Sequence, residues 1–539
     1  MNVSASPAST IGALIRRGAQ EHPDKPMVID PTGQVSYREL DVTSRTMAAT
    51  FVDAGIGPGT RVGLIMPNSS GWVQIAVALT RIGAVLVPFS TLLTGRELRD
   101  QLRVSDVAHL ITVDEFRGHR YLDDLGDALG CPGPRAGGMT NPELPALRRI
   151  WGLDEVFRPQ RFPDTRTVVD ALGDSVTPGD PMVIVFTSGS SGIPKGVIHS
   201  HGGALGAVAA GLEARCIDAD TRLYLPMPFF WVGGFGAGIL SALIAGATLV
   251  TEEAPAPQTT LALLHREKVT LFRGWPDQAV ALARQAQSTG INLSTLRPGS
   301  LEALLPAARR AEPGARANLF GMTESFGPYC GYRADTDMPR SAWGSCGKPF
   351  AGMEVRIVDD TAGTPVATGV TGEIQLRGPH VMQGICGRSR EEVFTPDGYY
   401  PTGDLGHLDD DGFLFYHGRS DDMFKVSGAT VYPSEVQTAL RTIDGVENAF
   451  VTRVDGEAGT RVAAAIVGRG DLTAEYIQEK ARNVLSSFKI PTIWRLIDDA
   501  EVPRGSTGKV DTRALRALLS TPVEVAERAP ASAGHAERS

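Results

Sequence analysis

The chain has 539 residues, too many for one hydrophobic core and enough for two or three domains. Hydrophobic residues make up 42% and charged residues 21% of the chain, proportions that exclude an intrinsically disordered protein. The net charge is −9 and no basic stripe follows a predicted helix, which argues against nucleic acid as a partner.

The first half of the chain alternates apolar, β-rich runs with helical patterns. Strands are predicted at 61–67, 84–89 and 109–113, and helices at 72–81 and 95–104. This alternation is typical of an α/β fold in which helices cover both faces of parallel sheets. The segment 131–177, rich in Pro, Gly and Arg, is predicted to be a surface excursion.

One uncharged segment, 229–250, is long enough to cross a bilayer. It contains five glycines, however, and divides into a helix at 237–243, a break at Gly246 and a strand at 248–250. A buried helix and strand are therefore predicted, and no transmembrane segment. The N-terminus lacks the features of a signal peptide. The five cysteines have no metal-ligand spacing, which predicts reduced thiols in a cytoplasmic protein.

The pattern changes near 418–422, where a small α+β unit begins with strands at 449–454 and 462–467 and a helix at 473–485. We predict a large domain over 1–419, made of sheets covered by helices. A small, mobile α+β domain is predicted over 420–525, followed by a disordered tail at 526–539.

The strongest local signal is the sequence MVIVFTSGSSGIPKGV at 182–197. A strand at 182–186 runs into a loop whose backbone N–H groups, hydroxyls and single cation, Lys195, suit phosphate oxygens. The P-loop of NTPases is excluded, because its lysine is followed by Ser or Thr at the start of a helix. Here Pro194 precedes Lys195 and Gly196 follows it.

This loop resembles the phosphate loop of the adenylate-forming superfamily, which includes acyl-CoA synthetases, peptide-synthetase adenylation domains and firefly-type luciferases. Four further motifs follow in the order of that family: FGMTE (320–324), YPTGDLG (400–406), GRSDDMFKVSG (418–428) and VPRGSTGKVD (502–511). The resemblance covers about residues 10–520 and is closest to bacterial fatty-acyl-type acyl-CoA ligases. Five motifs in one order are highly specific, whereas each alone is weak.

The resemblance implies a role for individual residues. The triphosphate would contact Thr187, Ser188, Gly189, Ser190, Ser191, Gly192 and Lys195. The nucleotide would also contact Phe320, Gly321, Met322 and Thr323, with Phe320 stacked on adenine and Thr323 at the α-phosphate. Glu324 would bind Mg²⁺, and a single carboxylate suffices because Mg²⁺ keeps waters and phosphate oxygens as its other ligands.

The later motifs carry the remaining implied roles. Asp404 would accept hydrogen bonds from the ribose hydroxyls, with Arg419 as a second ribose contact. Lys509 would be the mobile catalytic lysine and would act with Thr323 and Lys195. Asp421 would be the hinge for the small domain, and Lys425 to Gly428 would line the pantetheine tunnel.

The chain departs from the family pattern at four places. Ser191 replaces a usual threonine, Trp231 replaces a frequent histidine at the gate of the acyl site, and Cys346 replaces a small aliphatic residue. The sequence RPGSLEALLP (297–306) stands where relatives carry a Gly-Gly-Ala-Pro-like turn against adenine. Gly299 and Ser300 are the candidates to replace that turn.

The residues around Trp231, at the gate of the acyl site, predict the chemical class of the acid substrate. Trp231, Gly233, Gly234 and Phe235 are the predicted substrate residues, and the glycines, with Gly236 and Gly238, leave volume open. An apolar acid is therefore expected, either a fatty acid or a bulky terpenoid- or steroid-like acid. The run 229–243 has no acidic residue that would bind a substrate amine.

Together these features predict an ATP-dependent acyl-CoA ligase that forms an acyl-adenylate, releases pyrophosphate and then makes the CoA thioester. ATP, Mg²⁺ and coenzyme A are the expected cofactors, and a small-molecule carboxylic acid is the expected substrate. An adenylating enzyme that loads a carrier protein is the alternative, and a homodimer is left open. A non-catalytic nucleotide-binding module is disfavoured, because the lysine, the metal ligand and the hinge are all present.

Overall fold

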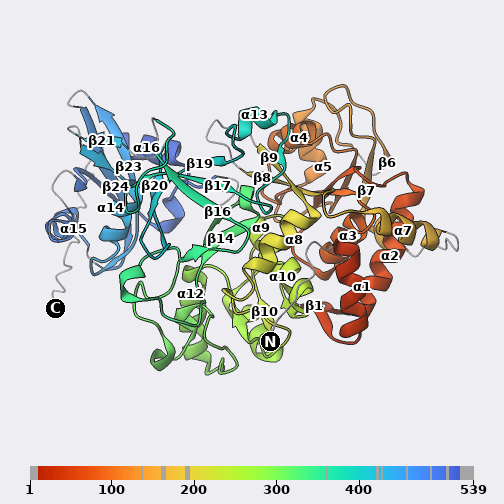
Figure 1. Ribbon diagram of the computed structural model, residues 1–539, viewed down its shortest axis with the longest axis horizontal. Helices are drawn as coiled ribbons and strands as arrows, with labels where there is room; N and C mark the ends of the chain where they lie inside the picture. The colour runs from red at the N-terminus through yellow and green to blue at the C-terminus, as the bar shows by residue number, and fades with distance from the viewer. Residues whose placement is uncertain are drawn as a thin grey trace, which may run out of the picture. The chain divides into compact units, whose positions relative to one another are not determined.

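A computed structural model describes residues 10–134, 137–158, 165–187, 195–359, 362–420, 424–426, 429–456, 459–470, 472–485, 489–505 and 509–521. The chain divides into two compact units, Met1–Tyr416 and His417–Ser539. Each unit builds its own sheets and hydrophobic core (Figure 1).

An eight-stranded sheet forms the centre of the first unit. Its order is β18 (Gly384–Ile385), β9 (Lys195–Ser200), β8 (Pro181–Thr187), β4 (Val85–Pro88), β3 (Arg61–Ile65), β5 (His109–Thr112), β7 (Arg149–Gly152) and β6 (Gly137–Gly138). The strands from β8 to β7 are parallel, and antiparallel strands close both edges. The predicted α/β class is confirmed.

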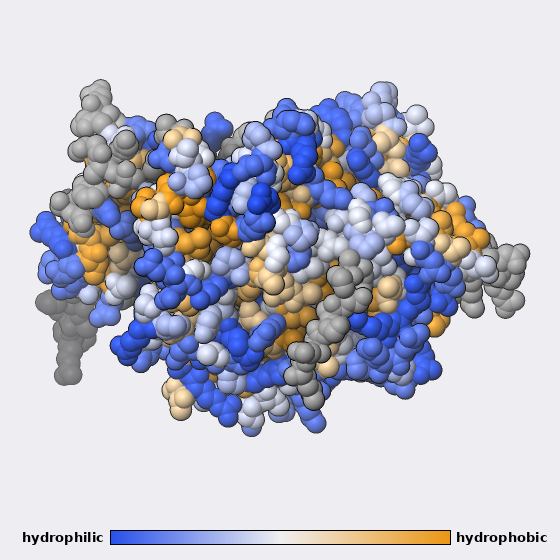
Figure 2. Space-filling view, in the orientation of Figure 1, coloured by the Kyte–Doolittle hydropathy of each residue, from blue (hydrophilic) through white to orange (hydrophobic). Residues whose placement is uncertain are grey.

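Helices cover both faces of this sheet because its central strands are apolar on both sides. Along β4, Leu86 belongs to one core cluster while Val85 and Val87 belong to another. In Figure 1, α4 (Gly95–Val104) and α5 (Tyr121–Ala128) lie above the strands, and α1 (Ile11–Glu21), α2 (Tyr37–Asp53) and α3 (Ser70–Thr80) lie below them. Hydrophilic residues cover most of the face drawn in Figure 2, and apolar residues reach the surface in patches.

The prediction of a surface excursion at 131–177 was wrong for much of that segment. Strands β6 and β7 extend the large sheet, and α6 (Leu153–Phe157) and α7 (Thr165–Ser175) follow them. Ile150 and Trp151 are buried, and the Trp151 indole N–H donates to Nδ1 of His109 at 3.2 Å. The two apolar residues of the RIWG sequence are a short strand signal that the surrounding Pro, Gly and Arg content obscured.

A second sheet has the order β12 (Leu271–Phe272), β10 (Arg222–Tyr224), β11 (Thr248–Val250), β1 (Pro26–Asp30) and β2 (Gly33–Ser36). The segment 229–250 leads into it through α9 (Val232–Gly234), a π-helix (Phe235–Leu240) and α10 (Ser241–Ala245). Gly246 then takes a left-handed conformation with φ of 70°, and the predicted break and strand are confirmed. Across the described residues, no helix combines the length and the hydropathy that a bilayer crossing requires.

Two antiparallel sheets carry the later motifs. One consists of β13 (Phe320–Met322), β14 (Gly327–Gly331) and β15 (Lys348–Pro349). The other consists of β16 (Glu354–Val358), β17 (Gly372–Arg377), β19 (Tyr400–Leu408) and β20 (Leu414–Arg419). Helices α8 (His201–Ala210), α11 (Pro257–Arg266), α12 (Pro276–Thr289) and α13 (Arg390–Val393) complete the list of longer elements in this unit.

The second unit is an α+β layer around β23 (Val446–Gly456), β24 (Gly459–Gly468) and β25 (Ile493–Leu496). Alternate residues of β24 belong to two clusters, one with α14 (Pro433–Leu440) and α15 (Ala474–Ala481), the other with α16 (Thr512–Ser520). A hairpin of β21 (Phe424–Val426) and β22 (Ala429–Val431) precedes them. The predicted strands are present, the predicted helix at 473–485 ends earlier, and the predicted tail lies outside the described residues.

Three buried histidines make the stability of the first unit depend on pH. Burial lowers the pKa of His109, His199 and His201 to about 4, whereas an unfolded histidine titrates near 6.5. Below about pH 6.5 the unfolded chain therefore binds more protons than the folded one. Stability should fall with decreasing pH by up to about 4 kcal/mol per pH unit.

We expect the melting temperature to drop clearly between pH 7 and pH 5, a window above the range where most carboxylates titrate. The exposed His265 provides the control, because His265→Gln should leave the pH profile unchanged. Equal melting temperatures at pH 7 and pH 5 would contradict this account.

Candidate active site

The two ends of the predicted phosphate loop lie side by side. Thr187 ends β8, Lys195 begins β9, and the two residues are paired directly in the antiparallel ladder. Ser188, Gly189, Ser190, Ser191 and Gly192 lie outside the described residues. The chain leaves the loop as a strand and not as a helix, which agrees with the exclusion of an NTPase P-loop.

The FGMTE motif forms a strand and a tight turn. Phe320, Gly321 and Met322 make up β13, and Thr323–Ser325 is a single 3₁₀ turn. A Cβ on Gly321 would lie 2.1 Å from the carbonyl oxygen of Gly327, so only glycine allows β13 and β14 to approach this closely.

His199 connects this turn to the phosphate loop. The residue is buried on β9, and its Nε2 lies 2.8 Å from the backbone carbonyl oxygen of Thr323. A carbonyl oxygen only accepts, so Nε2 carries the proton. Burial lowers the pKa of His199 to about 4, which keeps the ring neutral at physiological pH. Sequence reasoning missed this residue, since a lone histidine in a strand gives no signal of a partner 124 positions away.

Glu324 is the predicted metal ligand. Its side chain is buried, the Tyr400 hydroxyl donates to Oε1 at 3.1 Å, and the structure gives Oε2 no protein partner among the described residues. No group of three or more metal-ligating side chains occurs in the described part of the chain. A buried carboxylate with one neutral partner fits Mg²⁺ that takes its other ligands from water and phosphate.

Hydrogen bonds within the motif and to the neighbouring strand β17 fix the backbone of the Thr402-Gly403-Asp404 motif. The Thr402 hydroxyl donates to the carbonyl of Ile374 at 2.6 Å and accepts the Asp404 N–H at 3.0 Å. Gly403 has φ of 71°, a conformation that favours glycine, and its N–H donates to Oε1 of Glu373 at 3.1 Å. Asp404 itself is buried.

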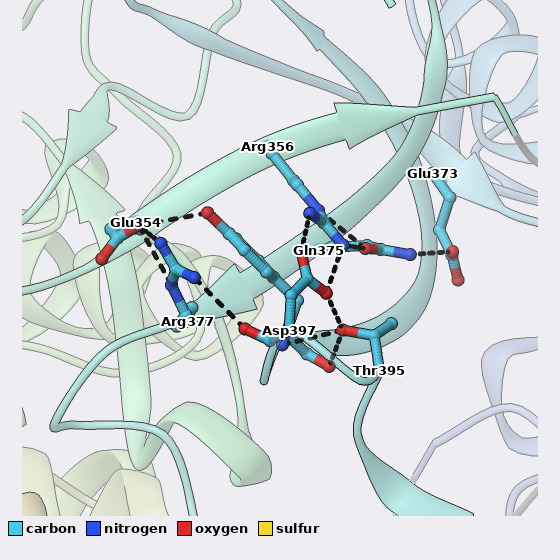
Figure 3. Close-up of polar contacts among 8 residues, drawn as sticks. Glu354, Arg356, Glu373, Gln375, Arg377, Thr395 and Asp397 are labelled. Carbon is cyan, nitrogen blue, oxygen red and sulfur yellow. Dashed lines mark hydrogen bonds and ion pairs between the residues drawn. The ribbon is translucent and has the colours of Figure 1, made fainter. Parts of the chain in front are cut away.

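Glu373 belongs to a polar network on the surface of this sheet (Figure 3). The amide of Gln375 donates to Glu373 at 3.0 Å, and Arg356 donates to Gln375 at 2.9 Å and to Asp397 at 3.2 Å. The guanidinium groups of Arg356 and Arg377 lie 3.7 and 4.3 Å from the centre of the Tyr399 ring. The network thus fixes the side chain that holds the Gly403 backbone.

Two features lie where adenine is predicted to bind: the Phe320 ring and the segment that contains Gly299 and Ser300. The half-buried Phe320 ring packs against Tyr416, with ring centres 4.5 Å apart. In the segment that replaces the usual turn, Gly299 has φ of 93° and Ser300 is buried. The Ser300 hydroxyl accepts the Phe272 N–H at 3.1 Å, so this segment is attached to the end of β12.

A pocket with about 280 Å³ of empty space lies behind the Thr323 turn. Its lining residues come from α8 and the turn after it, the segment around α9, and the residues after Ser325: Ala207, Val208, Gly211, Arg215, Val232, Gly233, Ala237, Phe326, Gly327 and Pro328. Arg215 is the one charged side chain among them. Sequence reasoning missed it, because the residue follows a helix that carries none of the motifs.

The predicted substrate residues fall into different environments. Gly233 lines the pocket, and Trp231 lies just before it, with its ring near Phe230 and Trp275 at 5.7 and 6.2 Å between ring centres. Phe235 is buried and contacts the rings of Trp72 and Phe326. A Cβ on Gly234 would lie 2.0 Å from the carbonyl oxygen of Pro228, so this glycine allows a close backbone approach.

The remaining predicted residues belong to the second unit. Arg419 ends β20 and is half-buried. Lys509 is exposed, and its carbonyl accepts the Gly505 N–H at 2.8 Å. Lys425 lies on β21 opposite Thr430, while its side chain, Asp421 and Gly428 lie outside the described residues.

A model of the AMP-binding enzyme family matches residues 15–386, and the chain belongs to this family. The resemblance to adenylate-forming enzymes is confirmed, as is the prediction of an AMP-forming acid–thiol ligase.

Several known proteins are similar to the chain over nearly its full length. A "3-[(3aS,4S,7aS)-7a-methyl-1,5-dioxo-octahydro-1H-inden-4-yl]propanoyl:CoA ligase" of Mycobacterium tuberculosis is 31% identical and covers 94% of this chain and 99% of its own. The protein of the same name from Rhodococcus jostii is 30% identical, with coverages of 95% and 99%. The solved structure of an anthranilate CoA ligase with anthranoyl-AMP has a TM-score of 0.78 at 22% identity, with coverages of 96% and 99%.

Alanine substitutions at Gly233 and Gly234 test which of these two positions faces the pocket. Gly234→Ala should place a Cβ against the Pro228 carbonyl and destabilise the protein by about 1–3 kcal/mol, lowering activity toward all acids alike. In Gly233→Ala the new Cβ would meet only the flexible Met227 side chain, so the melting temperature should change less. Its effect on activity should depend on the size of the acid. Equal effects of the two substitutions would contradict this assignment.

Proposed function

We propose that the enzyme is an ATP-dependent acyl-CoA ligase for a compact, bulky and largely apolar acid. The observation that carries this proposal is the position of the pocket. Phe326 lines it, and the Phe326 N–H donates to the carbonyl of Thr323, the residue implied at the α-phosphate, at 3.0 Å. An acid in the pocket would thus have its carboxylate beside the phosphate site.

The lining of the pocket and the names of two relatives support a compact, apolar acid. The walls of the pocket are mainly Ala, Val, Gly, Phe and Pro, which suits an apolar acid. The names of the two propanoyl:CoA ligases describe a two-ring dioxo acid. An acid of that general size is the best candidate for this chain.

In the first half-reaction, a carboxylate oxygen would attack the α-phosphorus, and the bond from that phosphorus to pyrophosphate would break. Lys195, Thr323 and Lys509 would supply the positioned cations and donors that stabilise the developing charge. Glu324 would hold Mg²⁺, which neutralises phosphate charge when bound. Phe320, Asp404 and Arg419 would hold the nucleoside.

In the second half-reaction, the thiol sulfur of coenzyme A would attack the acyl carbon, and AMP would leave. A rotation of the small domain near Asp421 would withdraw Lys509 and bring the segment from Lys425 to Gly428 to the pantetheine chain. The free state of all five cysteines fits a reducing compartment, and we place the reaction in the cytoplasm. Loading of a carrier protein remains the alternative, which a thiol-acceptor assay with CoA and carrier proteins distinguishes.

The two half-reactions should be separable. With ATP, Mg²⁺ and a bicyclic propanoate but no CoA, the enzyme should exchange labelled pyrophosphate into ATP, because the adenylate forms before any thiol is needed. Omission of the acid is the control and should abolish exchange. Exchange that required CoA would rule out a free acyl-adenylate intermediate.

Lys509→Ala should slow adenylation by about 10²–10³-fold, the usual effect of removing one positioned donor to a developing anion. Thioester formation from supplied acyl-AMP should be largely retained, since Lys509 has then left the site. Lys480→Ala removes another cation of the same unit, on α15, and should affect neither step. Equal losses in both half-reactions of Lys509→Ala would point to a structural role.

A further inference from the structure

Arg215 is a buried cation that the fold leaves without an anionic partner. The residue is 5% exposed, in the turn after α8. Its guanidinium donates to the carbonyls of Gly211 and Val208 at 3.0 and 2.7 Å and to the Ser241 hydroxyl at 2.9 Å. All three acceptors are neutral, and no ion pair joins Arg215 to a carboxylate among the described residues.

A neighbouring arginine, Arg273, makes the environment of Arg215 more positive. Nη2 of Arg273 donates to the backbone carbonyl of Arg215 at 3.1 Å, which brings a second guanidinium to this region. Burial, and then the charge of Arg273, lower the pKa of Arg215 to about 9, so the side chain is still a cation at neutral pH. A buried charge is costly unless it is paired, and the described residues give Arg215 the last carbonyls of α8 and a hydroxyl but no carboxylate.

The pocket beside Arg215 is where a ligand oxygen would pair with its guanidinium. Arg215 lines it, and the other lining side chains are apolar or absent. A guanidinium has five N–H donors, and only three hydrogen bonds to protein acceptors are present. Two of these acceptors are carbonyls at the C-terminal end of α8, where a cation is favourable, and this contact leaves two N–H groups of the guanidinium unused. Ligand pockets of this kind use one or a few polar groups to orient an apolar ligand.

We propose that the acid substrate carries a hydrogen-bond-accepting oxygen, a ketone or a second carboxylate, at the end remote from its reacting carboxyl group, and that Arg215 binds this oxygen. The proposal rests on the proposed function and adds a specificity-determining residue to it. The reacting carboxylate lies at the Thr323 end of the pocket, and Arg215 lies on the α8 side. A purely apolar acid would leave the buried donors unpaired and would be rejected for that reason.

The test compares three propanoates with the same bicyclic skeleton: one with a ring ketone remote from the carboxyl group, one with a methylene in its place, and one with a remote carboxylate. Pyrophosphate exchange gives kcat/KM for each acid. The wild type should prefer an oxygen-bearing acid by about 10- to 100-fold, the range expected for a buried hydrogen bond to a charged group. The better of the ketone and the dicarboxylate identifies the chemical class.

Arg215→Met keeps the length of the side chain and removes the charge. It should abolish the preference and raise the relative activity toward the methylene acid. Arg273→Met is the matched control, because this neighbouring arginine does not line the pocket, and it should keep the wild-type order. Melting temperatures of both variants separate misfolding from altered specificity.

Equal kcat/KM of the wild type for all three acids would overturn the proposal, and this comparison needs no variant to fold. An equal loss for all acids in a stable Arg215→Met protein would also overturn it. Absence of exchange with every acid tested would instead count against the proposed function and its substrate class.

Discussion

The hydrogen bond from Nε2 of His199 to the carbonyl of Thr323 is the interaction on which the geometry of the site depends. It joins β9, which begins at Lys195, to the turn that presents Thr323 and Glu324. The two segments are far apart in sequence and belong to different sheets. Two backbone bonds support the same link, because the Met382 N–H donates to the carbonyl of Glu324 and the adjacent Gln383 N–H donates to the carbonyl of Ile198 on β9, each at 2.8 Å.

The same histidine also reaches the acyl side of the site. Its ring contacts Phe326 at 4.9 Å between ring centres, and Phe326 lines the pocket. One buried side chain therefore contacts the phosphate-loop strand, the Thr323 turn and the wall of the acyl pocket. A polar network on the neighbouring sheet does a similar task for Asp404 through Glu373 and Gly403. Both supports act on backbone groups, the carbonyl of Thr323 and the N–H of Gly403.

Much of this arrangement could be predicted from local sequence, and some of it could not. Buried strands and helices gave clear periodicity, and α4 has the predicted bounds, because hydrophobic pattern and caps are local properties. The RIWG strand was missed, since two apolar residues in a polar context are too weak a signal. The contacts of His199 and Arg215 were missed for a different reason. Their partners are chosen by tertiary packing, and no spacing in the chain encodes them.

The glycines after Trp231 are required for more than one structural reason. Their density indicated open space, and Gly233 does line the pocket. Gly234, in contrast, faces the Pro228 carbonyl, and a Cβ on Gly238 would lie 3.0 Å from Leu225. The π-helix that follows adds one residue per turn and is frequent at functional sites. Close packing on one side of this segment and a pocket on the other therefore require glycine for opposite reasons.

His199 and Arg215 are both buried, but His199 is neutral and Arg215 is charged, because the two side chains differ in proton affinity. An imidazole titrates near neutral pH, so burial is enough to hold His199 neutral, and a neutral ring can serve as a permanent structural donor. A guanidinium starts from a pKa so high that the same burial leaves Arg215 charged at pH 7. The protein can thus bury a histidine at little electrostatic cost, but it can bury an unpaired arginine only at the expense of stability. A ligand oxygen bound to Arg215, as proposed, would offset part of this cost when the substrate enters the pocket.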